Sequence, residues 1–179
     1  MISTLISTAT PSNVASVSIS SGIDSTYDHY MFVFTDINPA TDGANFIFQV
    51  NAIGGADYND STMITTVFRA TKDELNNANG DLSEVSGEDQ PDVAGFQIIA
   101  SSVGNGADES CAGIMHLYSP SSTTYDKHFQ CRINEYQSGD SSQDYFVAGV
   151  INDTTAIDDI QFKMSSGYFD GVIQMYGIA

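Results

Sequence analysis

The chain has 179 residues, 41% of them hydrophobic, with 10 Phe and 9 Tyr, which is enough for one domain with a substantial core. Its 23 Asp and Glu residues against 5 Lys and Arg give a formal net charge of -18. Because that charge repels phosphate backbones and anionic lipids, we expect neither nucleic acid nor a membrane among the partners. The sequence contains no apolar run of membrane-spanning length and no basic, signal-like N-terminus.

Short segments in which apolar and polar residues alternate recur along the chain, and almost no helical periodicity is present. In chain order, the predicted strands span residues 15–20, 29–37, 45–52, 63–70, 94–100, 111–118, 127–136, 144–152, 157–164 and 172–177. Glycine-, serine- and asparagine-rich turns separate them. The pattern predicts an all-β fold with residues 1–179 as a single domain. We expect a two-sheet antiparallel β-sandwich, jelly-roll-like, of about ten strands, with a barrel as the alternative.

Residues 71–90 stand apart because they are rich in Asn, Asp, Glu and Gly. Thr71 and Glu74 have the spacing of a capping box, which predicts one short turn of helix at the start of this segment. The remainder is too polar for a long helix. We therefore predict an exposed polar loop over residues 71–90, which serves either as a contact surface or as a mobile connection.

The two cysteines, Cys111 and Cys131, fall on a predicted hairpin of residues 111–118 and 127–136. If Tyr118 faces Lys127, the two sulfurs are offset by roughly 10 Å along the strands. A disulfide requires Cα atoms within about 7 Å of each other. The sequence therefore predicts two free, buried thiols, which fits synthesis in a reducing cytoplasm.

The three histidines are His29, His116 and His128. In the same predicted register, His116 and His128 project from opposite faces of the hairpin or lie diagonally. A metal site needs converging ligands, and no close histidine spacing provides them. We therefore expect structural or surface roles for all three histidines.

No catalytic motif stands out, and we expect no enzyme and no cofactor. The nucleophile elbow G-x-S-x-G is absent, as is any helix after the glycine-rich turns that could cradle a phosphate.

Asp57, Asn59 and Asp60 form an oxygen-rich turn, the kind of ligand set that Ca²⁺ prefers, although the same residue types are ordinary turn formers. Tyrosines near turns are the candidates for glycan contact: Tyr58, Tyr125, Tyr136 and Tyr168.

Two ends of the chain carry a set of motifs that resembles a β-sandwich module of bacteriophage virion proteins, found in capsid-associated proteins and tail fibres of aquatic phages. Near the start, residues 21–30 read Ser-Gly-Ile-Asp-Ser-Thr-Tyr-Asp-His-Tyr, ahead of a hydrophobic strand and an Asn-Pro-Ala-Thr-Asp turn at residues 38–42. Further matching segments are Phe46 to Phe48, residues 54–58, residues 157–162, residues 165–167, Gly171 and residues 175–178. These motifs are structural, and the middle of the chain matches weakly.

The resemblance implies a structural virion protein, made in the host cytoplasm and carried on the capsid surface. Because the predicted strands begin near Val14 and continue to the last residues, we favour a capsid decoration or cement protein that binds the major capsid protein as a homo-oligomer, a trimer by resemblance. A receptor- or glycan-binding tail-fibre tip is the first alternative, and a hydrolase of surface polysaccharide is the second. The expected contacts are residues 2–14 and the loop 71–90.

Overall fold

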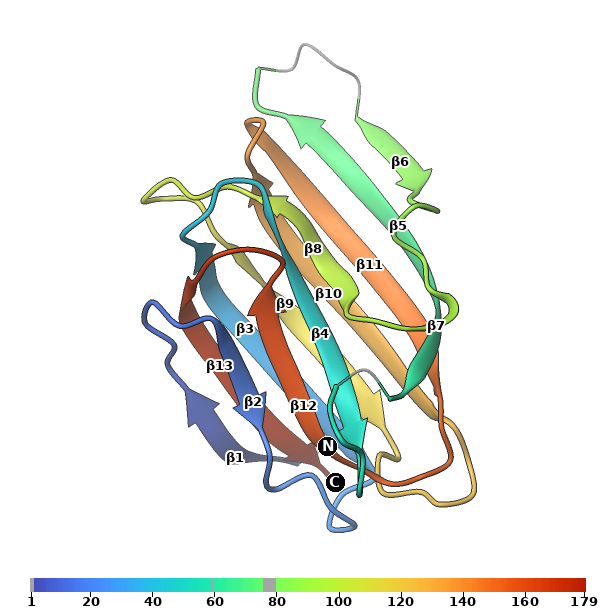
Figure 1. The fold of residues 1–179 in the computed structure, drawn as a ribbon. Helices are drawn as coiled ribbons and strands as arrows, with labels where there is room; N and C mark the ends of the chain where they lie inside the picture. Colours follow the sequence, from blue (N-terminus) through green and yellow to red (C-terminus); the bar gives the residue numbers. More distant parts are fainter. Residues whose placement is uncertain (1, 59, 76–79) are drawn as a thin grey trace.

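The computed structural model describes residues 2–58, 60–75 and 80–179. Within these residues the chain forms thirteen strands and no helix, and every strand pairing is antiparallel (Figure 1). The strands are β1 (Ser3–Ala9), β2 (Ser16–Ile19), β3 (His29–Pro39), β4 (Ala44–Ala52), β5 (Thr62–Asp73), β6 (Asp81–Glu84), β7 (Pro91–Ala94), β8 (Gln97–Val103), β9 (Cys111–Tyr118), β10 (Lys127–Gln137), β11 (Ser141–Asn152), β12 (Ile157–Met164) and β13 (Phe169–Ile178). The predicted all-β class is confirmed, with more strands than the ten expected.

The strands form one hydrogen-bonded sheet that curls until it is nearly barrel-shaped. Its main path runs β1-β13-β3-β9-β10-β8-β4-β12-β2, while β11 and β5 extend from β10, and β6 and β7 pair with β5. In Figure 1, the β8-β4-β12-β2 part lies in front of the part that contains β13, β3, β9 and β10. The two parts are joined where Val103 of β8 pairs with Gln137 of β10. Two separate sheets, as a sandwich requires, are therefore not confirmed.

The core lies inside this curl and is dominated by phenylalanine. Phe162 of β12 contacts Phe32 and Phe34 of β3, with ring centroids 5.5 and 5.1 Å apart. Phe48 of β4 meets Phe129 of β10 edge to face, with centroids 4.9 Å apart. Tilted and edge-to-face aromatic pairs add to the stabilisation that burial itself provides. The alternation that predicted these strands arises because each inward position enters this core.

The predicted polar loop over residues 71–90 is interrupted by strand at residues 71–73 and 81–84, its other described residues are turns or irregular, and residues 76–79 lie outside the described part of the chain. Strand β5 continues through Thr71, which pairs with Gln143 of β11 and Asp81 of β6. The proposed capping residue therefore lies in a strand. Strand β7 lies at the edge of the sheet and begins at Pro91, where a missing N–H is tolerated. These segments are polar because they lie at a sheet edge with little burial.

The hairpin of β9 and β10 forms as predicted, but its register is shifted by one residue. Tyr118 pairs with His128 rather than with Lys127. Since a one-residue shift moves side chains to the other face, His116 and His128 project from the same face, in diagonal positions. Cys111 and Cys131 are both free and buried, as predicted. Burial raises the pKa of both thiols, which keeps them protonated and unreactive.

The two ends of the chain lie together at one edge of the sheet. Strand β1, within the segment 2–14 expected to make contacts, pairs with β13, and Ser3 lies opposite Ile178. The turn before β3 packs against the same place, because the ring of Tyr27 lies over Gly177. The hydroxyl of Tyr30 accepts a hydrogen bond from the Asp24 amide at 2.9 Å and donates one to the Asp24 carbonyl. The two motif-bearing segments of the sequence are thus in direct contact.

Replacing Gly177 by alanine is expected to destabilise the fold, because the added Cβ would lie 2.3 Å from a ring carbon of Tyr27. Overpacking of this kind costs about 1–3 kcal/mol. Gly87→Ala is the matched control, since nothing lies within 4 Å of its added Cβ. Urea denaturation of the two variants measures the difference. Equal midpoints for both variants would show that the Tyr27 ring moves aside at no cost.

Candidate functional site

One side of the sheet carries a broad surface that we call the outer face, made by alternate side chains of β3, β9, β10, β11 and β5. Burial alternates along these strands, so that the residues between these positions enter the core. The cross-strand pairs bring the alternate residues into rows. The outer face consists of His29, Met31, Val33, Ile114, His116, Tyr118, His128, Gln130, Arg132, Asn134, Asp144, Phe146, Ala148, Val150, Ile64, Thr66, Phe68 and Ala70.

A stack of three planar groups crosses the middle of the outer face. Phe68 and Phe146 lie nearly parallel, with an interplanar angle of 6° and centroids 4.7 Å apart. The guanidinium of Arg132 covers the other side of the Phe146 ring at 4.7 Å from its centroid. Arg132 also forms an ion pair with Asp144, with a shortest N–O distance of 2.6 Å. Stacking and the ion pair together hold these exposed side chains in place.

Three adjoining hollows follow this stack, with volumes of about 360, 390 and 430 Å³. Ala148 lines the first two, and Arg132 lines the first and the third. The hollows exist because small side chains such as Ala148 and Thr66 alternate with the large ring of Phe68 and with Gln130. The outer face therefore offers a shallow relief into which a partner's side chains can pack.

The charge of the outer face differs sharply from that of the whole chain. Asp144 is the one acidic residue among the outer-face side chains defined above, although the chain has 23 acidic residues, and Glu84 of β6 borders the face opposite Phe68. Its charge is balanced by Arg132. Aromatic residues and arginine are enriched at protein interfaces, where other charged residues are depleted. Ile114 and Phe68 add exposed apolar area, with 40% and 42% of their surface accessible. Sequence reasoning missed this surface because it depends on the register of five strands.

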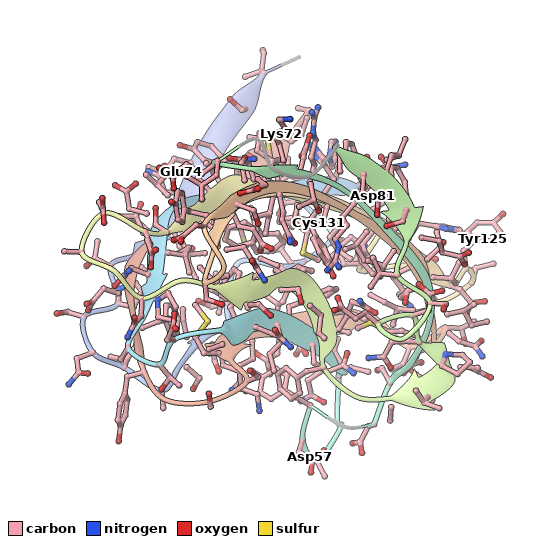
Figure 2. All side chains as sticks on the ribbon, turned by 90° about the horizontal axis from the view of Figure 1, so that it is seen from above. Asp57, Lys72, Glu74, Asp81, Tyr125 and Cys131 are labelled. Atoms are coloured by element: carbon pink, nitrogen blue, oxygen red, sulfur yellow. The ribbon has the colours of Figure 1, made fainter. Side chains whose placement is uncertain are left out.

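The predicted calcium turn gains no support from its described residues. The side chain of Asp60 accepts a hydrogen bond from the Ala56 amide at 2.7 Å, which is the role of a turn former. Asn59 lies outside the described residues. Figure 2 shows Asp57 at the periphery of the molecule, away from the curled sheet. Among the described residues, no three His, Cys, Asp or Glu side chains gather as a metal site would require.

The tyrosines proposed for glycan contact come from different parts of the fold. Tyr136 of β10 donates a hydrogen bond to Glu74 at 2.6 Å, and Tyr58 packs near Phe96 with ring centroids 6.5 Å apart. Tyr125 and Tyr168 are exposed in the connections before β10 and before β13. Figure 2 places Tyr125 far from Asp57, and Tyr58 is the residue that follows Asp57 in the sequence. Tyr136 continues the outward row of β10 beyond Asn134, at the border of the outer face, and the other three tyrosines lie outside that face.

A second polar group lies inside the curl, where β10 and β11 approach β8. Glu135 is 1% exposed, and its carboxyl oxygens make no hydrogen bond of regular geometry, although the Ser101 backbone lies close enough to oppose the effect of burial on its pKa. Burial raises its pKa to about 9, and the nearby carboxyl of Glu88 adds to the shift. Glu88 itself accepts hydrogen bonds from the hydroxyls of Tyr145 and Ser101. Glu135 is in phase with the inward residues of its strand, so the sequence did contain a signal for its burial.

Comparison with known proteins found no matching family model, no matching curated protein and no matching solved structure. The described part of the chain also contains no helix with the length and apolar character needed to cross a bilayer.

Proposed function

We propose that the protein is a structural component of a bacteriophage virion, a decoration or cement protein that binds the major capsid protein through its outer face. In this proposal it is made in the host cytoplasm, assembles as a trimer on the capsid surface, and is not an enzyme. The curled sheet then corresponds to a jelly-roll-like, sandwich-type module. The setting is proposed from the motifs of the sequence, and the mode of binding is proposed from the composition of the outer face.

The observation that carries the mode of binding is the near-absence of acidic charge from the outer face. A chain with a net charge of -18 repels other acidic surfaces over most of its exterior. Close packing against a protein partner is least opposed where Arg132 neutralises Asp144 and apolar groups surround them. Ile114, Phe68 and the hollows beside them supply the area and relief that a protein interface needs.

Introducing one negative charge into this face tests the proposal. Ile114→Glu is expected to weaken binding to capsids that lack the protein by at least about tenfold, because the new carboxylate must be desolvated at the interface. Ile53→Glu is the matched control, because Ile53 is an exposed isoleucine in the turn after β4. Co-sedimentation with capsids measures binding, and light scattering measures the oligomeric state.

Failure of the unaltered protein to bind such capsids would overturn the capsid role. Equal binding by Ile114→Glu and the unaltered protein would overturn the role of the outer face. A monomeric mass at every concentration would contradict the proposed trimer.

Glycan binding at a tail-fibre tip is the second candidate function, and one observation favours it. Phe68 and Phe146 form an exposed aromatic pair beside the charged side chains of Arg132 and Asp144. Sugars bind through an apolar face and ring hydroxyls, which such a combination can contact. Immunolabelling of the parent particle separates the two functions: label over the tail favours the glycan role, and label over the head excludes it.

A further inference from the structure

Two imidazoles of the outer face meet although they are 87 residues apart in sequence. The Nε2 atom of His29 in β3 lies 2.8 Å from the Nδ1 atom of His116 in β9. The register of the two strands explains the contact, since His29 pairs with Tyr118 and Met31 pairs with His116. The two histidines are thus diagonal neighbours on the same face of the sheet. Sequence spacing gives no hint of this meeting, which depends on the pairing of β3 with β9.

The ring of Tyr118 packs against both imidazoles. Tyr118 stacks on His29 with ring centroids 4.7 Å apart and an interplanar angle of 26°. The same tyrosine lies nearly parallel to the His116 ring, at 6.2 Å. A pair of ligands that is already held together loses little conformational freedom when it binds a shared ligand. Both rings are half-buried and still reach the solvent side of the sheet.

Metal ions bind the neutral form of imidazole. Burial lowers the pKa of both imidazoles, and the Coulombic effect of His116 lowers that of His29 further. When the two facing nitrogens bind one ion, the imidazole that donated the hydrogen bond carries its proton on its other ring nitrogen, so no proton is lost.

The geometry is close to that of a chelate. Two Zn–N bonds of about 2.0–2.1 Å at a tetrahedral angle place the nitrogens about 3.3–3.4 Å apart. The two nitrogens, now 2.8 Å apart, need to separate by roughly half an ångström, and each ring must turn so that its lone pair points at the ion instead of at the other nitrogen. No third His, Cys, Asp or Glu joins the pair among the described residues, so water fills the remaining positions.

We propose that His29 and His116 form a two-imidazole site for a divalent transition-metal ion of the Zn²⁺, Ni²⁺ and Cu²⁺ class. Imidazole favours these ions over Mg²⁺ and Ca²⁺, which prefer oxygen ligands. The site lies on the outer face proposed above to bind the capsid, but binding of the ion requires only the isolated chain, so the two proposals can fail separately. It also differs from the oxygen-rich turn at Asp57, which predicted a different class of ion.

Calorimetric titration of the metal-free full chain with Zn²⁺ at pH 7.5 tests the site. We expect one equivalent to bind, and His29→Ala and His116→Ala each to weaken that binding by at least about tenfold, because a single imidazole is not a chelate. His128→Ala is the matched control: it removes the third histidine of the same face and should leave binding unchanged. Ca²⁺ should produce no specific binding at this site.

Imidazole NMR signals of the unaltered protein provide a readout that needs no variant. Zn²⁺ should shift the ring resonances of His29 and His116 together and leave those of His128 in place. Absence of Zn²⁺ binding in the unaltered protein overturns the proposal, as does binding that both alanine variants retain in full. Shifts confined to His128 also overturn it, even if a variant fails to fold.

Discussion

Replacement of Phe162 by alanine is expected to lower the free energy of unfolding by about 3–5 kcal/mol, the usual cost of deleting a buried phenylalanine ring. The ring is fully buried. It contacts four other phenylalanines, two from β3 and two from β4: Phe32, Phe34, Phe46 and Phe48. Its removal leaves a cavity between the front and rear parts of the curled sheet, and these parts cannot close over it without moving whole strands.

Phe68→Ala is the matched control for this prediction, because it deletes the same ring from the exposed outer face. The free energy of unfolding should fall by less than half as much as in Phe162→Ala, since Phe68 is 42% exposed. Chemical denaturation of both variants by urea gives the two free energies. Similar losses at the two positions would mean that the aromatic cluster around Phe162 is not the centre of the core.

Glu135→Gln is expected to make the protein more stable than the unaltered chain in alkaline solution. The folded state keeps a proton on Glu135 up to a pKa of about 9, whereas the unfolded state loses it near 4.5. Between these two pH values, folding therefore takes up a proton. The stability that protonated Glu135 contributes is complete below pH 4.5 and declines as the pH rises to about 9. The decline has a limiting slope of about 1.4 kcal/mol per pH unit. Glutamine fills the same space and has no such proton to lose.

The test is the stability difference between Glu135→Gln and the unaltered protein, measured by urea denaturation at pH 5, 7 and 8.5. The difference should grow with pH in favour of the variant. Glu84→Gln is the control, because Glu84 is an exposed glutamate on the edge strand β6 and should give a nearly constant difference. Parallel stability curves for the Glu135→Gln variant and the unaltered protein would show that Glu135 ionises without cost in the folded state.

The sequence predicted best those strands whose side chains alternate between the core and the solvent. Strands β9 and β12 were predicted to the residue, because their inward positions are apolar along most of their length. The three strands β1, β6 and β7 were missed. Each has at least one face without a core to cover, so its residues show no alternation of hydrophobicity. Their pairing with β13 and β5 is made by the backbone, which leaves little trace in the sequence.

The candidate surfaces were less predictable than the strands, because they depend on which strands are neighbours. The outer face was not predicted, and the shift of one residue in the β9–β10 register decided between the two arrangements expected for His116 and His128, in favour of diagonal positions on one face. The contact of His29 with His116 depends in turn on β3 lying beside β9. Glu135 was different, since its place in an alternating apolar series was visible in the sequence alone.

The pairing of β1 with β13 also affects how the chain folds during synthesis. Strand β1 is synthesised before β13, so their hydrogen bonds cannot form until β13 has left the ribosome. Until then the backbone of the polar strand β1 lacks its hydrogen bonds to β13. The Ser- and Thr-rich composition of β1 helps to keep the nascent chain from associating with neighbouring chains in that interval.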